Sequence, residues 1–446
     1  MIKQTSRNTF NAFALFIRNP ALETLATELE YYINTEEDRL GVILRDKTDQ
    51  NFSIIALARN CYECFQIQSC ICDITSLKDA RSKLIATLNT IPKYISGKRF
   101  DGMNLFAIRT KHENLHPYFL YLNSTPQLYA AKKIMSELAM YIPDKDGNFV
   151  KDFQSISGFD SRVWELYLHC FLREEGFLLN NMHSIPDFIT ANKTQHLAIE
   201  AVVVGRNSLN PPTSKDMPPV FSPAQFQQEL TNDMPLRFAS VLNRKLKKEY
   251  WKLSHISNFP FLIAVADFHE AASMTWSFPS LIDYLYGKHS IIRYDSNKNP
   301  ISTSIPIQPY HKESGACVPS GFFEQPGTEN ISGILFSATA TLSKFNRMGL
   351  QAGFALDNNI HRRIVCFHND APNATKPRFK IQTIGLNSNE TWAEGMNLFH
   401  NPHAKHPVNK LLFPSIAHHE LIKDVLYSQL PAFHPYSSWT ISISTL

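Results

Sequence analysis

Glycine is scarce in this sequence, which has 16 glycines among 446 residues. Loops that cradle phosphate groups use several glycines at fixed spacing, and neither the Walker pattern nor the G-x-G-x-x-G dinucleotide pattern occurs here. The stretch VVVGRNSLNPP follows an expected strand without completing the dinucleotide pattern. The nucleophile elbow and the H-E-x-x-H pattern of zinc proteases are also missing. These absences argue against a nucleotide cofactor and against a helix-borne zinc site of the protease kind.

Long apolar runs are absent as well. No stretch approaches the roughly twenty consecutive apolar residues that span a membrane. The opening stretch MIKQTSRNTFNAFALFIRNP is interrupted by Arg, Asn and Pro before a secretory signal could form. Together with an odd cysteine count of 7, these features predict a cytoplasmic protein with free thiols and no membrane partner.

Four of the cysteines follow the spacing C-x2-C-x5-C-x-C, namely Cys61, Cys64, Cys70 and Cys72. A zinc site usually draws on two well-separated pairs, whereas the residues between these cysteines alternate as they do on a strand. On a strand, Cys70 and Cys72 would share one face. We therefore favour free, buried or half-buried thiols and keep a zinc site as the less favoured alternative.

The charge balance limits what can be said about partners. A net charge of +4 is too weak to indicate nucleic-acid binding by itself. The contents of hydrophobic residues (43%) and charged residues (19%) are those of an ordinary globular protein that can bury a sizeable core. A nucleic-acid surface would therefore have to come from a local cluster of basic residues.

The sequence predicts two units, residues 1–145 and residues 146–446. The first is expected to be a small α+β unit. Its expected elements are helices at 21–34 and 76–95, the latter capped by Ser76, and strands at 40–46, 52–60 and 62–74.

The second unit begins after a polar connection at 146–157. Its order of helix, strand, strand, helix, strand, helix and strand is typical of a three-layer α/β fold. The expected strands are 183–190, 196–205, 259–268, 331–340, 362–370 and 378–386. The expected helices are 161–177, two segments around Pro235, 277–287 and 414–430, with loops at 206–223, 288–329 and 400–407.

Three carboxylates fall on this framework in a suggestive order. Glu165 lies on the first helix, Asp187 opens a strand within Pro-Asp-Phe, and Glu200 lies in the next, otherwise apolar strand. Singly, Asp187 could be a turn residue, Glu165 a solvated helix residue and Glu200 a salt-bridge partner. A Glu in an apolar strand is costly, however, unless it binds something. Hard oxygen ligands on adjacent strands suit Mg²⁺, which activates water for phosphodiester hydrolysis.

This arrangement resembles the PD-(D/E)XK, or restriction-endonuclease-like, nuclease superfamily between Gly158 and Phe268. The resemblance implies an α/β, three-layer core of αβββαβ order, here with an N-terminal α+β unit and C-terminal elaborations. It further implies that Asp187 and Glu200 bind Mg²⁺ or Mn²⁺ and that Glu165 is an accessory carboxylate.

One residue of the superfamily pattern is missing. A lysine is expected two residues after the Glu, where this sequence has Val202. Such a lysine positions the attacking water and stabilises charge in the transition state. Some members of the superfamily move it to the following helix, which we expect at 244–253 with a buried stripe through Leu242, Leu246, Tyr250 and Leu253. Lys245 or Lys248 is therefore the candidate, and without either the domain would be inactive.

Basic residues near this helix are candidates for contacts with nucleic acid. They are Arg244, Lys247 and Lys252, interleaved with Tyr250 and Trp251. A solvated helix face explains the outermost lysines equally well. Lys344 and Arg347, in SKFNRMG, could form a second phosphate contact or simply lie at the start of a helix.

Histidines cluster late in the chain: His400, His403, His406, His418, His419 and His434. We expect mostly surface histidines, with a metal or acid–base role as the less favoured alternative.

The sequence thus predicts a cytoplasmic Mg²⁺-dependent nuclease that acts on DNA rather than RNA, and a homodimer is compatible with it. A restriction or defence role follows by analogy alone. The rival interpretation is a non-catalytic nucleic-acid-binding or assembly protein on a degenerate nuclease fold, and a further rival is a metal hydrolase assisted by the late histidines.

Overall fold

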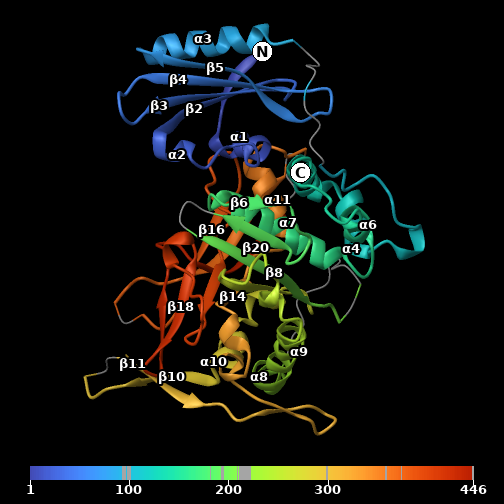
Figure 1. Cartoon of the computed structure of the whole chain (residues 1–446), viewed down its shortest axis with the longest axis vertical. Coiled ribbons are helices and arrows are strands. Elements are labelled where there is room, and N and C mark those ends of the chain that lie inside the picture. The colour runs from blue at the N-terminus through green and yellow to red at the C-terminus, as the bar shows by residue number, and fades with distance from the viewer. Residues whose placement is uncertain are drawn as a thin grey trace.

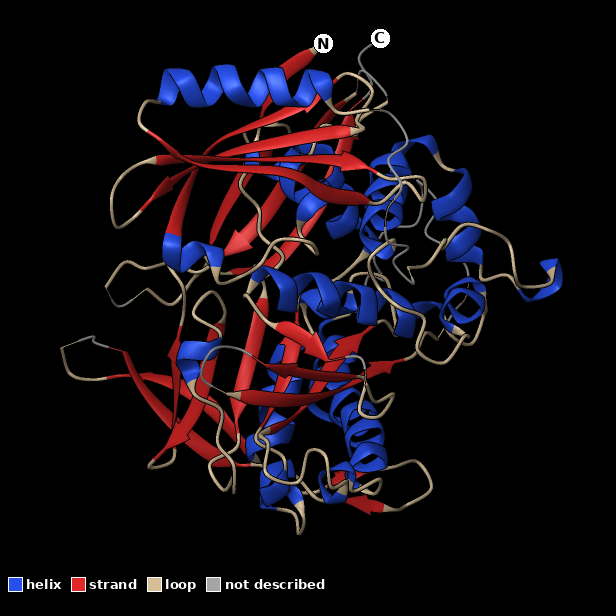
Figure 2. Ribbon diagram, turned by 45° about the horizontal axis from the view of Figure 1, so that its top comes forward, coloured by secondary structure: helices blue, strands red, loops and turns tan. Residues whose placement is uncertain are grey.

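The protein has a mixed α/β fold with several sheets, as the sequence predicts at the level of fold class (Figure 1 and Figure 2). The computed structural model describes the chain except for residues 93–96, 98–101, 181, 192–194, 208, 210–221, 298–299, 357–358, 373 and 444–446. Most of the loop expected at 206–223 lies outside the described residues.

The N-terminal part is a five-stranded antiparallel sheet in which consecutive strands pair. The strands are β1 (Ile2–Thr5), β2 (Ala26–Asn34), β3 (Arg39–Asp46), β4 (Phe52–Arg59) and β5 (Phe65–Ile74). Three helices accompany them: α1 (Arg7–Ala14), α2 (Leu22–Leu25) and α3 (Leu77–Thr90). Helix α3 covers one face of the sheet (Figure 1) and begins at the predicted cap, where Ser76 Oγ accepts a hydrogen bond from Asp79 N at 3.1 Å.

The helix predicted at 21–34 is wrong for most of its length, because only α2 is helical and β2 follows it directly. The apolar spacing resembles a helical stripe, but Tyr31, Tyr32 and Ile33 favour a strand. Backbone pairing with both β1 and β3 supplies hydrogen bonds that a helix in this place could not make. Tertiary pairing therefore decides the conformation here.

Four helices connect this sheet to the rest of the chain. They are α4 (Pro117–Ser124), α5 (Tyr129–Ala139), α6 (Phe149–Gln154) and α7 (Phe159–Glu174). The polar connection predicted at 146–157 thus contains a helix, α6. Helix α7 is the helix predicted to carry Glu165, and Gly176 follows its end with a φ of 82°.

The central sheet has eight strands in the order β19-β18-β17-β14-β9-β8-β7-β6. Strands β8, β9 and β14 run parallel to one another, and β6, β7 and β8 form an antiparallel meander. The strands are β6 (Leu178–Asn180), β7 (Phe188–Ala191), β8 (His196–Val204), β9 (Phe261–Asp267), β14 (Gly333–Ser337), β17 (Met396–His400), β18 (Ala417–Ile422) and β19 (Val425–Gln429).

Helices pack on both faces of this sheet. Leu197 and Ile199 of β8 belong to the same apolar cluster as Trp164 of α7. Ala198 and Val202, which point the other way, cluster with Phe238 on the opposite face. The helices after β8 are α8 (Pro223–Gln228), α9 (Met234–Leu246), α10 (Phe278–Tyr286) and α11 (Leu342–Gln351). The sheet is therefore the middle layer between α7 and α9.

Smaller strands complete the fold. They are β10 (Lys288–Tyr294), β11 (Pro300–Pro306), β12 (Tyr310–His311), β13 (Cys317–Val318), β15 (Ile360–Phe367), β16 (Arg378–Thr383) and β20 (Pro435–Ile443). Strands β16, β15 and β20 form a three-stranded sheet, and β10 and β11 form a hairpin at the lower end of the molecule in Figure 1. The irregular segment predicted at 288–329 therefore contains two paired hairpins.

The C-terminal helix predicted at 414–430 is also wrong. Strands β18 and β19 form a hairpin there, turned at Lys423 and Asp424 with φ values of 48° and 67°. Two consecutive residues of positive φ are the geometry of the tight hairpin turn that matches the twist of the strands. Pairing of β18 with β17 then extends the central sheet.

Residues on both sides of the predicted boundary between residues 145 and 146 contribute to one apolar cluster. One continuous apolar cluster contains Phe13 and Phe65 from the N-terminal part, Trp164 from α7 and Leu398 from the central sheet. The division into two units stays a prediction from sequence. Among the described residues, no helix is both long enough and apolar enough to cross a membrane.

Candidate metal centre

Asp187 immediately precedes β7 and lies beside Glu200 of the adjacent strand β8. Phe188 pairs with Ile199 in the antiparallel ladder, which brings the two acidic residues together. The backbone N of Asp187 donates to Glu200 Oε2 at 3.3 Å, and Ala201 N donates to Asp187 Oδ2 at 2.8 Å. Glu200 lies in the middle of β8, within the sheet, where its side chain is buried and alternates with apolar neighbours.

Asp187 also stabilises the fold, and its replacement should lower the free energy of unfolding. Its carboxylate takes the place of a strand carbonyl by accepting the Ala201 N–H. We expect Asp187→Ala to lower the free energy of unfolding by about 1–3 kcal/mol, because a partly buried backbone donor loses its partner. Asp187→Asn keeps an acceptor oxygen and should cost less. Urea unfolding of both variants measures the difference, and equal losses would contradict this role for the carboxylate.

Lys245 comes from α9 on the opposite side of Glu200. Its Nζ lies 2.5 Å from Glu200 Oε1. The helix ends at Leu246, and Glu249 has a φ of 49°, so the helix predicted at 244–253 stops early. Lys248 consequently lies beyond the helix with an exposed side chain. Of the two candidate lysines, the structure brings Lys245 against the carboxylates.

Glu165 approaches from α7, on the other face of the sheet. The helix is anchored beside it by Trp164 Nε1, which donates to Ala264 O at 3.0 Å. Arg162 Nη1 lies 2.9 Å from Glu165 Oε2 and holds the carboxylate one turn along the helix. Burial, with the neighbouring Asp187 carboxylate, raises the pKa of Glu165 to about 8.

Two cations beside these acids were missed by the sequence analysis, and they are Arg162 and Lys145. Lys145 Nζ donates to the backbone oxygens of Asp187 at 3.3 Å and His183 at 3.4 Å. Burial lowers the pKa of Lys145, while Asp187 and Glu165 oppose that shift. No local pattern marks Lys145, because its contacts with His183 and Asp187 bridge about 40 residues of sequence.

The carboxyl groups of the cluster resist ionisation. Burial, reinforced by Asp187, raises the pKa of Glu200 to about 7, and burial also raises the pKa of Asp187. Burial and the two carboxylates raise the pKa of the adjacent Tyr250 hydroxyl to about 12. Perturbed carboxyl groups gathered in one place are a feature of functional sites more often than of ordinary cores.

A pH-dependent gain in stability is expected from Glu165→Gln. The folded state binds the proton of Glu165 more tightly than a chain with the ordinary pKa of 4.5. Folding is therefore disfavoured progressively as the pH rises from 4.5 toward 8. Without added metal, Glu165→Gln should melt at a higher temperature than the wild type at pH 8 and at nearly the same temperature at pH 5. A gain that is equal at both pH values would contradict the raised pKa.

The residues present fit a hard divalent cation better than zinc. No group of three or more His, Cys, Asp or Glu side chains able to hold a metal is found among the described residues. Mg²⁺ needs only one or two carboxylates, with water and substrate phosphate completing the octahedron. Asp187 Oδ1 and Glu165 Oε1 take part in no hydrogen bond between described residues. Asp187 and Glu200 would hold the ion, and Glu165 lies on the side of α7.

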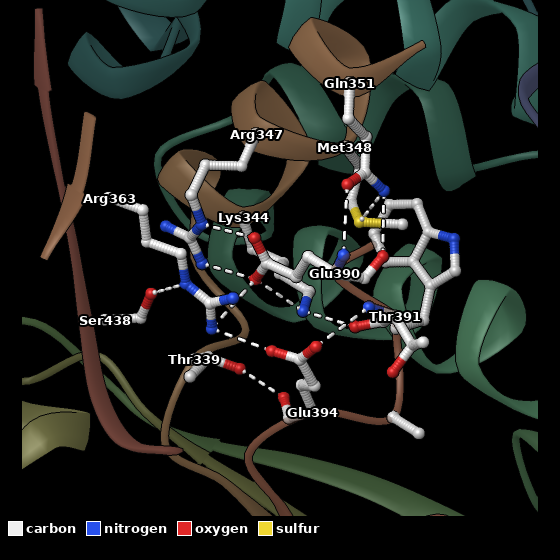
Figure 3. A network of polar contacts seen from close by, with 12 residues as sticks. Thr339, Lys344, Arg347, Met348, Gln351, Arg363, Glu390, Thr391, Glu394 and Ser438 are labelled. Carbon is white, nitrogen blue, oxygen red and sulfur yellow. Dashed lines mark hydrogen bonds and ion pairs between the residues drawn. The ribbon is translucent and has the colours of Figure 1, made fainter. Parts of the chain in front are cut away.

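The predicted second phosphate contact is wrong. Lys344 and Arg347 lie on α11 with side chains 0% and 1% exposed, and both are paired with Glu390 (Figure 3). Nucleic acid cannot reach them without unfolding this region. Among the other basic candidates, Arg244 and Lys247 are exposed, and Lys252 is exposed but pairs with Glu249 at 2.8 Å.

The late histidines are mostly buried, contrary to prediction. His400, His418, His419 and His434 are no more than 8% exposed. His400 Nε2 and His418 Nδ1 lie 2.9 Å apart, and His419 contacts Asn397 and Ser428. His400, His418 and His419 link β17 to β18, and among the described residues the late histidines form no metal-binding group.

The cysteines have free thiols as predicted. Their burial was predicted less well, since Cys61, Cys70 and Cys72 are exposed and Cys64 is buried. Cys70 and Cys72 do share one face of β5, with sulfur atoms 3.9 Å apart.

No protein-family model, curated protein or solved structure matches this chain. The chemistry of the centre is therefore inferred from its geometry.

Proposed function

We propose that this chain is a metal-dependent nuclease of the restriction-endonuclease-like, PD-(D/E)XK kind. The observation that carries the proposal is the contact of Lys245 with Glu200 beside Asp187. The residue pattern lacks a lysine at Val202, and α9 supplies one at the same carboxylate. The order α7, β6, β7, β8, the consecutive helices α8 and α9, and β9 supports the proposal, since it matches the αβββαβ order that the resemblance implies if α8 and α9 count as one helical segment.

The residues of the centre suit phosphodiester hydrolysis. A bound Mg²⁺ or Mn²⁺ would lower the pKa of its water ligand and neutralise charge on the phosphate. Asp187 and Glu200 would provide the oxygen ligands. Lys245, which contacts Glu200, would orient the attacking water and stabilise the negative charge that develops on the phosphate oxygens. Glu165, oriented by Arg162, would accept a hydrogen bond from the attacking water.

Nucleic acid is the proposed substrate, and DNA is favoured over RNA. Arg244 and Lys247 are exposed around the end of α9, next to Lys245. Their side chains would contact the phosphate backbone in a sequence-independent way. A role in restriction or defence is compatible with such an activity. The free thiols of all seven cysteines favour a cytoplasmic location. A homodimer is compatible with the proposed activity.

The test is a cleavage assay with plasmid and single-stranded DNA in Mg²⁺, Mn²⁺ or EDTA. Wild-type protein should nick or cut DNA only with metal. Asp187→Asn and Glu200→Gln should abolish cleavage, since both keep hydrogen-bonding oxygens and remove the charge. Glu249→Gln, an exposed carboxylate near α9, is the matched control and should cleave normally. Cleavage that survives both site substitutions would overturn the assignment.

A non-catalytic nucleic-acid-binding or assembly protein is the second candidate. It is favoured by the same ion pair, because Lys245 already neutralises Glu200 and a metal ion would have to compete with it. DNA binding that needs no metal, without cleavage under any condition, would support this alternative.

A further inference from the structure

The segment between β6 and β7 leads directly into Asp187 without belonging to a strand. Residues 182–187 lie outside the antiparallel pairing of these two strands. Met182 is 82% exposed and Ile185 is 49% exposed, so the segment lies at the surface. Its carbonyl oxygens therefore have no partners in a strand ladder, and in an ordinary surface loop water would satisfy them.

Three alternate carbonyl oxygens of this segment are instead contacted by side chains from distant parts of the chain. Lys145 Nζ donates to His183 O at 3.4 Å and to Asp187 O at 3.3 Å. His255 Nε2 lies 2.9 Å from Ile185 O. Because a carbonyl oxygen only accepts, this ring nitrogen is the donor. Two side chains thus bind positions 183, 185 and 187 in turn.

A ring contact strengthens the hold of His255 on the segment. Its imidazole is stacked on that of His183, with ring centres 3.9 Å apart and planes inclined by 6°. His255 lies in the connection between α9 and β9, whereas Lys145 lies between α5 and α6. Both side chains are half-buried. The segment is therefore held independently from two parts of the chain that are far apart in the sequence.

The sheet fixes Asp187 from the other side. Asp187 Oδ2 accepts from Ala201 N at 2.8 Å, and Asp187 N donates to Glu200 Oε2 at 3.3 Å. With Lys145 on its carbonyl oxygen, both backbone polar groups of Asp187 have partners. Distances between a metal ion and its ligands tolerate errors of only about 0.2 Å. A displacement of this backbone would therefore be felt directly in metal binding.

We propose that Lys145 and His255 are positioning residues, which hold the segment 182–187 and thereby set the metal affinity of Asp187. This inference rests on the proposed function, because it takes Asp187 to be a ligand of a divalent cation. Neither side chain needs to touch the ion. Groups that orient a metal ligand without binding the metal typically contribute about 10- to 100-fold to metal affinity.

The charge of Lys145 allows positioning to be told apart from electrostatics. Its ammonium group lies close enough to Asp187 and Glu165 to interact with both charges. An ammonium group in this place repels a metal ion, so removal of the charge alone would strengthen metal binding. Loss of the hold on the segment acts in the opposite direction. Weaker binding by Lys145→Met is therefore specific to positioning.

Titration with Mn²⁺, followed by electron paramagnetic resonance, tests the proposal. Lys145→Met and His255→Phe should each bind Mn²⁺ at least about tenfold more weakly than the wild type. Lys145→Arg keeps the charge and the donors and should stay close to the wild type. The matched control is Lys151→Met, which removes an exposed lysine of α6 and should bind normally. A merely structural role would lower the free energy of unfolding and leave the Mn²⁺ affinity of the folded variants unchanged.

Hydrogen exchange of the metal-free protein provides a second measurement, which does not depend on the metal centre. The amides of residues 182–188 should exchange faster in Lys145→Met and in His255→Phe than in the wild type, and Lys151→Met should leave them unchanged. His255→Phe keeps an aromatic ring against His183 and removes the hydrogen bond, so it serves as the test if Lys145→Met fails to fold.

The outcomes separate this inference from the proposed function. Absence of Mn²⁺ binding by the wild type would overturn the proposed function, and with it the effect on metal affinity, even if the exchange rates rise as expected. Binding by the wild type that is equally tight in both variants, or tighter in Lys145→Met, would overturn the positioning role alone. Unchanged exchange in both variants would also overturn it, because these side chains would then not hold the segment.

Discussion

Replacing Lys245 with glutamine is expected to slow DNA cleavage by about 10²–10³-fold at saturating metal. The ammonium group lies 2.5 Å from Glu200 Oε1, and it is the only one of the two candidate lysines that the structure brings to that carboxylate among the described residues. Glutamine keeps much of the side-chain length and hydrogen bonding but removes the positive charge. The loss should therefore reflect the stabilisation of negative charge in the transition state.

Lys248→Gln is the matched control for this prediction. It removes the same charge three residues further along, from an exposed side chain beyond the end of α9. Single-turnover cleavage of supercoiled plasmid compares the three proteins, with circular dichroism to verify folding. A wild-type rate for Lys245→Gln, or an equal loss in Lys248→Gln, would contradict the role given to Lys245.

Glu390→Gln is expected to lower the free energy of unfolding by about 3–5 kcal/mol. Glu390 is the acid shared by three buried cations (Figure 3). Its oxygens lie 2.7 Å from Lys344 Nζ, 2.8 Å from Arg347 Nε and 3.5 Å from Arg363 Nη2. Removing its charge would leave these cations buried with too few carboxylates, which costs more than the loss of a single contact.

The same network predicts sensitivity to acid. Burial opposes ionisation of Glu390, but Arg347, together with Lys344 and Arg363, holds its pKa well below the usual range. The stabilisation is thus fully present above the ordinary pKa of 4.5 and is lost as the pH falls through the lowered value.

Urea unfolding at pH 7 measures the effect of Glu390→Gln. The control is Glu249→Gln, which breaks the exposed pair with Lys252 and should cost no more than about 1 kcal/mol. Loss of DNA affinity by Lys344→Ala with unchanged stability would contradict the structural role and restore the predicted phosphate contact.

The elements around the metal centre could be predicted because their patterns are local. Helix α7 has a continuous apolar face, and β8 and β9 are nearly unbroken apolar runs. Proximity of Asp187 to Glu200 followed from two expected strands that lie close together in the sequence. Lys245 could be named because the basic helical stretch that carries it lies between the strand pair and the next apolar strand in the sequence.

The failures have a common physical cause, which is long-range contact. Lys145 joins the centre through tertiary packing, so no spacing in its neighbourhood indicates it. The sequence around Lys344 and Arg347 is that of a surface helix. In the structure both side chains are buried because they pair with Glu390, which lies in a loop far away in the sequence. The segment 414–430 has helical spacing of its apolar residues. In the structure β18, which lies in this segment, instead pairs with β17 at the edge of the central sheet. In this segment, strand pairing outweighs local helical propensity.

Binding of Mn²⁺, followed by electron paramagnetic resonance, tests most directly whether Asp187 and Glu200 form a metal centre. The wild-type protein should bind the ion at neutral to mildly alkaline pH, where the raised carboxyl pKa values allow deprotonation on binding. Asp187→Asn and Glu200→Gln should each abolish that binding, and Glu249→Gln should retain it. Absence of binding to the wild type, or binding that persists in both site variants, would contradict the metal centre.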